Sequence, residues 1–184
     1  MGVYRVATGS IADVRAIRAA ELRTQILMFA CTPPEYVAEL VSLDVALTVH
    51  NSAVALAISR TAKSDTCVYV KIDSGLGRLG VPIAEAADFV SSVAALPNIR
   101  LEGLYTHLPF YQAVGREWAR DCMTDFQRLL SELARRGIHI PITQAIASAG
   151  IVGSAIDTCT AVCPGHLLYG GLSVVRPDVG DLSG

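Results

Sequence analysis

The sequence predicts an α/β fold: an incomplete (β/α)₈ TIM-type barrel of about seven parallel strands, lacking the first strand–helix unit. Three observations predict it. Seven short runs are almost continuously apolar, which is typical of strands buried on both faces of a sheet. Segments with helical periodicity alternate with these runs along the chain. Polar residues follow the runs, and the carboxyl ends of barrel strands share one face, where barrel enzymes place their sites.

Each expected strand is a short apolar run between polar or turn-forming residues. The strands are expected over residues 3–7, 25–30, 45–50, 68–73, 101–107, 142–148 and 160–163. A complete barrel takes about 250 residues, or about 30 for each unit, so the 184 residues hold about six units. An open doubly wound sheet is the alternative. It is disfavoured because no Gly-x-Gly-x-x-Gly follows the first strand, and because its ligands gather at one crevice rather than at many strand ends.

Residues that favour a first helical turn stand ahead of the helical segments. Ser10 and Asp13 have the spacing of a capping box, and the apolar face of their helix is expected to extend to Leu22. The other start signals are Thr32 before two prolines, Asn51, and Pro82. The longest amphipathic stripe covers residues 118–133 and is followed by Gly137, which is expected to end it. A shorter helix is expected over residues 149–155.

The composition excludes several functional classes. The chain has 15 Lys and Arg against 17 Asp and Glu, a net charge of −2, so binding to nucleic acid or to an anionic membrane is not expected. No apolar run approaches the roughly 20 residues of a membrane span, and no signal peptide is visible, so we expect a cytoplasmic protein. The five cysteines lack a Cys-x-x-Cys pattern and predict reduced thiols. Neither they nor the four histidines have metal-ligand spacing, so no metal is expected.

One segment, Val70-Lys-Ile-Asp-Ser-Gly-Leu-Gly-Arg-Leu-Gly80, combines a lysine inside the barrel with a glycine-rich turn. Lys71 and Asp73 share a face of their strand because they are two residues apart. A buried lysine must be paired or have a shifted pKa. The glycines allow the loop to pass close to a ligand, and Arg78 adds a fixed fork of donors. The simpler interpretation is a buried Lys–Asp ion pair followed by a turn.

The same segment closely resembles the Lys-x-Asp-Thr-Gly-Met-x-Arg-x-Gly signature of the alanine racemases. These are pyridoxal-phosphate enzymes with a barrel domain followed by a β-rich domain. Three further segments agree in order and spacing. Leu101-Glu-Gly-Leu-Tyr-Thr-His107 is similar to the strand that ends in the family's histidine. Ala147-Ser-Ala149 resembles the Asn-Ser-Ala phosphate turn, and Val162-Cys-Pro-Gly-His-Leu-Leu-Tyr-Gly170 resembles Val-Arg-x-Gly-Ile-x-Leu-Tyr-Gly.

The resemblance implies a pyridoxal 5′-phosphate cofactor and a full-length protein that interconverts the L and D forms of a small amino acid such as alanine. Arg78 would hydrogen-bond the phenolic oxygen of the cofactor, with Lys71, carbamylated in many relatives, held beside it. His107 would lie near the ring; taken alone, it could equally be a core histidine. The implied catalytic residues are Lys71, Arg78 and His107, and the implied cofactor-binding residues are Arg78, His107, Ser148, Cys163, Gly165 and His166, the last two through backbone N–H groups on the phosphate.

One departure from the family pattern lies beside the pyridine ring. Cys163 stands where the racemases have an arginine against the ring nitrogen, and a thiol is only a weak donor or acceptor. Ala147 likewise replaces the asparagine of the phosphate turn. These changes keep a second reaction open, a D-amino-acid aldolase or dehydratase of the same fold. No family role corresponds to His50, and we interpret His50-Asn51 as the cap of a helix.

A second departure concerns the lysine that carries the cofactor in the family, which lies at the end of the first barrel strand. Lys63, in a polar stretch before a strand, and Lys71 are poor substitutes. Residues 1–170 are therefore expected to form a partial cofactor-binding barrel, and residues 171–184 a linker toward an absent β domain. The family's homodimer is expected of the full-length protein. This chain alone is expected to be inactive and to associate through open sheet edges. A non-catalytic cofactor-binding remnant is a further alternative.

Overall fold

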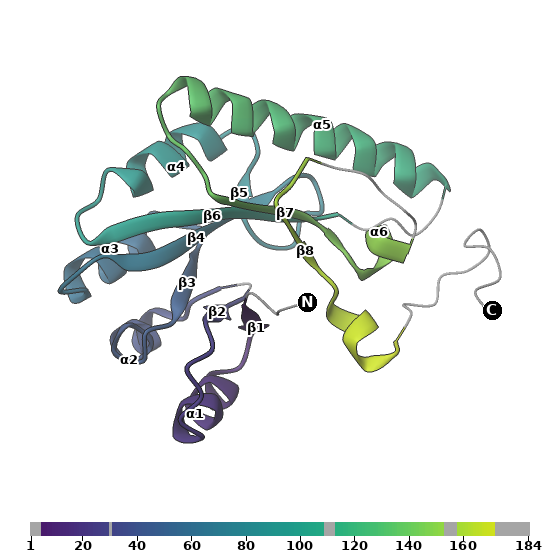
Figure 1. Cartoon of the computed structure of the whole chain (residues 1–184). Coiled ribbons are helices and arrows are strands. Elements are labelled where there is room, and N and C mark those ends of the chain that lie inside the picture. The colour runs from purple at the N-terminus through teal and green to yellow at the C-terminus, as the bar shows by residue number, and fades with distance from the viewer. Residues whose placement is uncertain (1–4, 30, 109–112, 153–157, 172–184) are drawn as a thin grey trace.

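The strands form one parallel sheet that curves into a half-barrel (Figure 1). The computed structural model describes residues 5–29, 31–108, 113–152 and 158–171. Neighbouring strands follow the order β1-β2-β3-β4-β6-β7-β8. The strand β5 is not part of this order and pairs with β4. The strands are β1 (Val6–Thr8), β2 (Ile26–Met28), β3 (Ala46–Val49), β4 (Thr66–Asp73), β5 (Val81–Pro82), β6 (Ile99–Leu108), β7 (Ile142–Ala147) and β8 (Ala161–Cys163).

This sheet confirms the predicted incomplete parallel barrel. All seven expected strands are present, although β1, β2 and β3 are shorter than the apolar runs that predict them. Residues 3 and 4 of the first expected strand lie outside the described residues. The short β5 is not among the expected strands, because two residues leave no apolar run in a sequence.

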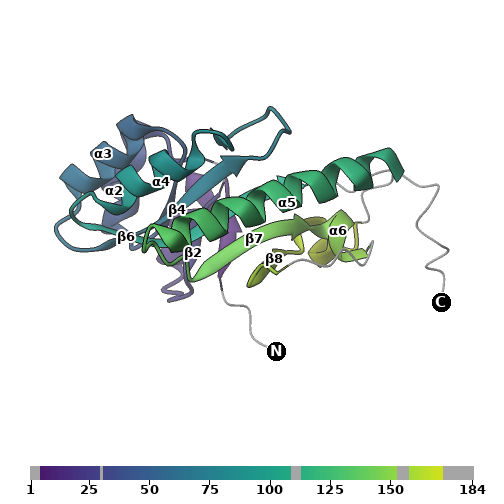
Figure 2. The same cartoon turned by 90° about the horizontal axis from the view of Figure 1, so that it is seen from above.

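Every main strand is followed by a helix or a helical turn, as a barrel requires. The α-helices are α1 (Ile11–Ala19), α2 (Val37–Ser42), α3 (Ser52–Thr61), α4 (Ala86–Ala94), α5 (Ala113–Arg135) and α6 (Ser148–Val152), and the 3₁₀ turns are η1 (Pro34–Tyr36) and η2 (Gly165–Tyr169). Figure 2 shows the long α5 lying along the same side of the sheet as α4. Both helices contact β6 and each other. The last three residues of the helix expected over 149–155 lie outside the described residues.

Three helix ends agree with their sequence signals. The Ser10 side chain accepts a hydrogen bond from the Asp13 backbone N–H at 3.2 Å, and Asn51 accepts one from Val54 at 2.9 Å. Gly137 follows α5 with a φ of +78°, and the next residue donates back to the carbonyl of Leu133, which ends the helix.

Three other local expectations are wrong. Thr32 is no cap: it is buried, and α2 begins only after a 3₁₀ turn preceded by Pro33. Pro82 belongs to β5 rather than to a first helical turn, and α4 begins at Ala86, because residues 81–82 pair with the end of β4. Leu22 does not extend the apolar face of α1. It follows the end of that helix and is 56% exposed.

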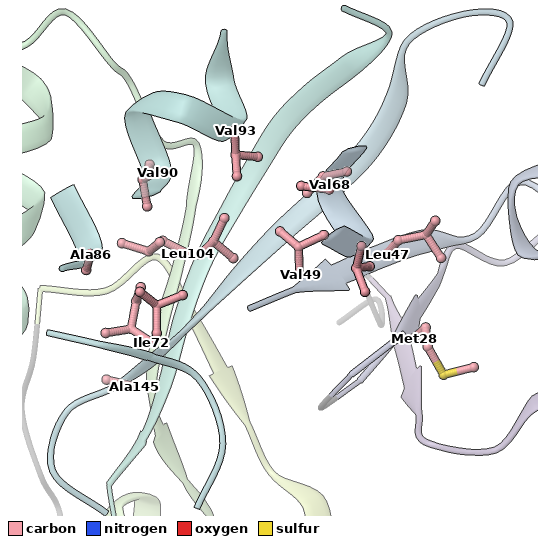
Figure 3. Close-up of a cluster of buried hydrophobic side chains, with 14 of the residues drawn as sticks. Met28, Leu47, Val49, Val68, Ile72, Ala86, Val90, Val93, Leu104 and Ala145 are labelled. Atoms are coloured by element: carbon pink, nitrogen blue, oxygen red, sulfur yellow. The ribbon is translucent and has the colours of Figure 1, made fainter. Parts of the chain in front are cut away.

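The main hydrophobic core lies between the outer face of the sheet and the helices. Val68, Val70 and Ile72 alternate along β4 and point into this core, as the period of two requires. Ala86, Val90 and Val93 of α4 pack against them and against neighbouring strands (Figure 3). An irregularity in the β4–β6 register adds one residue to β6, so that Leu101 and Leu104, three residues apart, both reach the same core.

The inner face of the sheet carries a second, smaller cluster. Its buried members are Leu27, Ala46, Tyr69 and Tyr105, with Phe29 packed against them. Gly103 lies in the same region, and a Cβ built on it would overlap the ring of Tyr69. Glycine is therefore required at this position so that the Tyr69 ring can lie flat against β6.

No helix in the described part of the chain is long and apolar enough to cross a membrane. Within the same residues, no group of three or more His, Cys, Asp or Glu side chains is arranged to hold a metal ion.

Replacing Gly103 with alanine tests the close contact between β6 and Tyr69. We expect Gly103→Ala to lower the free energy of unfolding by about 1–3 kcal/mol, because the added Cβ would lie 2.0 Å from the ring of the buried Tyr69 and the ring or the strand must shift. Urea unfolding measures this. Gly9→Ala is the control, since its Cβ would make only an ordinary contact at 3.9 Å, and its cost is expected to be smaller. Equal costs for the two variants would contradict the predicted overlap.

Candidate active site

Basic side chains gather where β3, β4 and β6 end. Lys71 lies near the end of β4, Arg78 on the loop that follows it, and His107 near the end of β6. Burial lowers the pKa of His107, and the positive charges of Arg78 and Lys71 lower it further; burial and the charge of Arg78 lower the pKa of Lys71 in the same way. The structure therefore brings these three residues together, as the sequence predicts from separate segments.

Lys71 is held out of water without a carboxylate partner. Its side chain lies on the inner face of β4, the residue is 3% exposed, and its amine is 4.7 Å from the centroid of the Tyr105 ring. Among the described residues, no carboxylate lies within 4 Å of that amine. Burial, together with the charge of Arg78, lowers the pKa of Lys71 to about 8, while Asp73 opposes the change. A close Lys71–Asp73 ion pair is therefore not the role of this segment.

Asp73 instead holds the loop that carries Arg78. Its carboxylate accepts hydrogen bonds from the backbone N–H groups of Gly75 and Gly77, at 3.0 and 3.1 Å. At the far end of the loop, a Cβ on Gly80 would lie 2.5 Å from the Asp73 backbone nitrogen, so only glycine lets the chain return this closely. The Ser74 hydroxyl also donates to Thr106 of β6 at 3.0 Å. The loop is thereby fixed to both strands that supply the site.

His107 is poised to remain uncharged. It is partly buried, and burial with the charges of Arg78 and Lys71 lowers its pKa from 6.5 to about 4. At neutral pH its imidazole is therefore neutral, with one nitrogen able to donate and the other able to accept.

A second group of site residues lies where β7 and β8 end. Ser148 follows β7, and its buried hydroxyl donates to the backbone carbonyl of Pro164. Gly165 has a φ of +37°, and a Cβ there would lie 3.4 Å from the Ser148 hydroxyl oxygen. The pairing of Ala147 with Cys163 sets these two turns side by side. His166 is exposed on η2.

Cys163 is a neutral thiol. Burial raises its pKa above the usual value of 9, and a hydrogen bond from the Gly165 backbone opposes this only in part. It therefore offers neither a positive charge nor a strong donor at the position where the alanine racemase signature has arginine.

His50 lies at the end of β3 beside these groups, and the sequence gives it no role beyond the cap of the next helix. It follows β3, and Asn51 uses its side-chain oxygen for the cap of α3, so its amide NH₂ faces the His50 Nε2 atom at 3.3 Å. The Nδ1 atom is buried and has no hydrogen-bond partner among the described residues. Burial and the charge of Lys71 lower the pKa of His50. The alternation of Ala46, Thr48 and His50 along one face of β3 could have placed it here.

The opposite, amino-terminal end of the sheet holds a cavity of about 650 Å³ that is unrelated to these groups. Arg5, Gln25, Cys67 and Glu102 are among its lining residues. The Arg5 guanidinium lies 2.8 Å from the Glu102 carboxylate and also donates to Gln25, so the charge is neutralised within the fold. In barrels this end contributes stability, and the site lies at the other end.

Replacing Asp73 tests how the Arg78 loop is held. We expect Asp73→Ala to accelerate amide hydrogen exchange at Gly75 and Gly77, because both N–H groups lose their acceptor. Asp73→Asn keeps an acceptor oxygen and is expected to preserve most of the protection. Equal protection in the wild type and Asp73→Ala, measured by NMR, would contradict this role.

The low pKa of His107 predicts acid sensitivity. Between pH 6.5 and about 4, the unfolded chain binds a proton at this residue and the folded chain does not, so stability falls as the pH falls through this window. NMR detection of the His107 ring proton should give a midpoint near 4. A midpoint above 6 would contradict both the burial of the ring and the effect of the Arg78 and Lys71 charges on it.

The chain is similar to known proteins over almost its whole length. The family model described as the alanine racemase N-terminal domain matches residues 1–173. The alanine racemase of Methanococcus maripaludis is 29% identical over 173 residues, covering 92% of this chain and 46% of that protein. That of Desulfovibrio desulfuricans is 31% identical, covering 92% of this chain and 47% of that protein.

Solved structures agree with this relationship. The alanine racemase of Clostridium difficile 630 in complex with cycloserine superposes with a TM-score of 0.88 at 26% identity, covering 95% of this chain and 49% of that structure. The Bacillus anthracis enzyme with bound L-Ala-P gives 0.82 at 26% identity, covering 95% and 46%. The chain thus spans about half the length of the relatives it matches. From the matched family model and the shared barrel, we conclude that this chain belongs to the alanine racemase family, whose N-terminal domain it represents.

Proposed function

We propose that the chain is the cofactor-binding barrel of a pyridoxal-phosphate-dependent racemase acting on a small amino acid, alanine. The observation that carries the proposal is the convergence of Lys71, Arg78 and His107 at one end of a sheet built on the alanine racemase pattern. For the whole protein, we extend the proposal to L- and D-alanine as substrate and product and to a homodimer.

The donors at this end suit an anionic aromatic cofactor. Arg78 offers a permanently charged fork for the phenolic oxygen. The neutral His107 can lie beside the ring without adding another charge. The backbone N–H groups of Gly165 and His166 suit the phosphate, since glycine at 165 leaves no side chain in the way. The Gly165 N–H would exchange its hydrogen bond to the Cys163 thiol for one to a phosphate oxygen. The Ser148 hydroxyl would exchange its bond to Pro164 for one to a phosphate oxygen.

When bound, pyridoxal phosphate supplies an electron sink that weakens the bond between the α-carbon and its hydrogen in an amino acid. The residues of this chain would bind and orient the group. The loop fixed by Asp73 would hold Arg78 in place, and the uncharged Cys163 would leave the pyridine nitrogen without a charged partner.

Neither lysine of the chain is placed to attach the cofactor. Lys63 is exposed between α3 and β4, at the end of β4 opposite the site. Lys71 lies in the site but is only 3% exposed, with its amine over the Tyr105 ring. We therefore propose that this chain binds the cofactor without a covalent bond and does not racemise alanine by itself. When the chain is mixed with pyridoxal phosphate and reduced with borohydride, both lysines should remain unlabelled.

The neutral thiol at Cys163 favours one second candidate, a D-amino-acid aldolase or dehydratase on the same barrel. The pyridine nitrogen of the cofactor would lack the arginine partner that it has in the racemases, so the reaction at the substrate need not be racemisation. Product analysis of the whole protein with D- and L-alanine, serine and threonine separates the two. Exchange of alanine enantiomers supports racemisation, whereas aldehyde or 2-oxo acid products from serine or threonine support the alternative.

Cofactor binding can be followed through the single tryptophan. The Trp118 ring packs against the Arg78 loop, where a Cβ on Gly75 would lie 3.4 Å from it. We expect pyridoxal phosphate to quench its fluorescence, and Arg78→Ala to raise the Kd about tenfold or more, because a charge-assisted hydrogen bond is lost. Arg60→Ala, on the distant end of α3, should leave the Kd unchanged. Saturable binding that is identical in Arg78→Ala and wild type would contradict the proposed site.

A further inference from the structure

The Tyr105 ring is fixed on three sides inside the barrel. It comes from β6, is 2% exposed, and stacks on Phe29, which follows β2, with a centroid separation of 5.1 Å and an interplanar angle of 21°. Its hydroxyl lies 3.1 Å from the Thr48 hydroxyl on β3. Three strand segments, far apart in the sequence, therefore set the position and tilt of one aromatic ring.

A cation lies over the π-face of this buried ring. The Lys71 amine lies 4.7 Å from the ring centroid, within the range of a cation–π interaction. The other charged or titratable groups facing this lysine are Arg78 and His107 on the loop and β6, His50 after β3, and Asp73 on its own strand. Most of these are cationic or neutral, so among the described residues the ring provides the close attractive contact to the ammonium.

We propose that Tyr105 is a positioning residue for Lys71: its ring, braced by Phe29 and Thr48, holds the ammonium group at the end of β4 and favours its charged form. Held there, Lys71 keeps a set distance from Arg78, whose like charge would otherwise displace the flexible side chain. The inference deepens the proposed function, since it rests on Lys71 lying in the cofactor site. Its test reads Lys71 directly and needs no cofactor.

The experiment uses the small number of lysines in the chain. With ¹³C-labelled lysine, NMR shows two Cε signals, from Lys71 and Lys63, and a pH titration gives the pKa of Lys71. In Tyr105→Leu, which removes the ring, we expect that pKa to fall by about 0.5–1 unit, because the charged form loses the π-face. Tyr105→Phe keeps the ring and should restore the wild-type value to within about 0.3 units. An unchanged or higher pKa in Tyr105→Leu, or no restoration by phenylalanine, would overturn the proposal.

A second measurement on the wild type does not depend on the folding of a variant. Ring current from Tyr105 should shift the Lys71 Cε protons upfield of those of Lys63. No upfield shift in the wild type would overturn the proposal. If these results hold but pyridoxal phosphate does not bind, the positioning role stands and the proposed function fails. If the cofactor binds but the ring-current and pKa effects are absent, the proposed function stands and the positioning role of Tyr105 fails.

Discussion

The organisation of the site follows from one constraint: a lysine amine buried on the inner face of β4 whose neighbouring carboxylate is used elsewhere. The Oδ1 atom of Asp73 accepts hydrogen bonds from two N–H groups of the following loop, so Asp73 fixes the loop that carries Arg78 instead of pairing closely with Lys71. The positive charges of Lys71 and Arg78 then remain close together, and burial strengthens their effect on each other. Both the depressed pKa of Lys71 and the neutrality of His107 result from this arrangement.

A cluster of uncompensated positive charge is costly in a folded protein unless something offsets it. Within the chain, the partial offset is the face of the Tyr105 ring. The positive charges of Lys71 and Arg78 can also attract an anion that enters from the open end of the sheet. At the other end, by contrast, the Arg5 charge is matched by Glu102, whose pKa is lowered to about 2 by hydrogen bonds from Cys67 and Arg5 despite its burial. The two ends of the half-barrel thus differ. The amino-terminal end is ion-paired and contributes stability, whereas the carboxyl end is positively charged and suited to binding an anion.

Much of this could be predicted from the sequence, because apolar runs and strand-end polar residues have a direct physical meaning. The alternation of apolar runs with helical segments predicts the strands and their parallel pairing. The order of the motifs predicts the grouping of Lys71, Arg78 and His107. The roles of individual polar groups did not follow, since spacing cannot tell which partner a side chain selects. Asp73 could equally have paired with Lys71, and Pro82 joined a strand because it pairs with Asp73, nine residues earlier in the chain. His50 received no role in the site because its neighbour Asn51 gave a sufficient local explanation as a helix cap, which the structure confirms for Asn51.

The site claim can be tested most directly by mapping backbone amide shifts in ¹⁵N-labelled protein during a titration with pyridoxal phosphate. We expect the perturbed amides to cluster on residues 74–80, at His107, and at residues 148 and 165–166, where the carboxyl ends of four strands meet. Perturbations centred instead on Arg5, Arg100 and Glu102, at the amino-terminal cavity, would show that the basic groups around Lys71 are not the binding site.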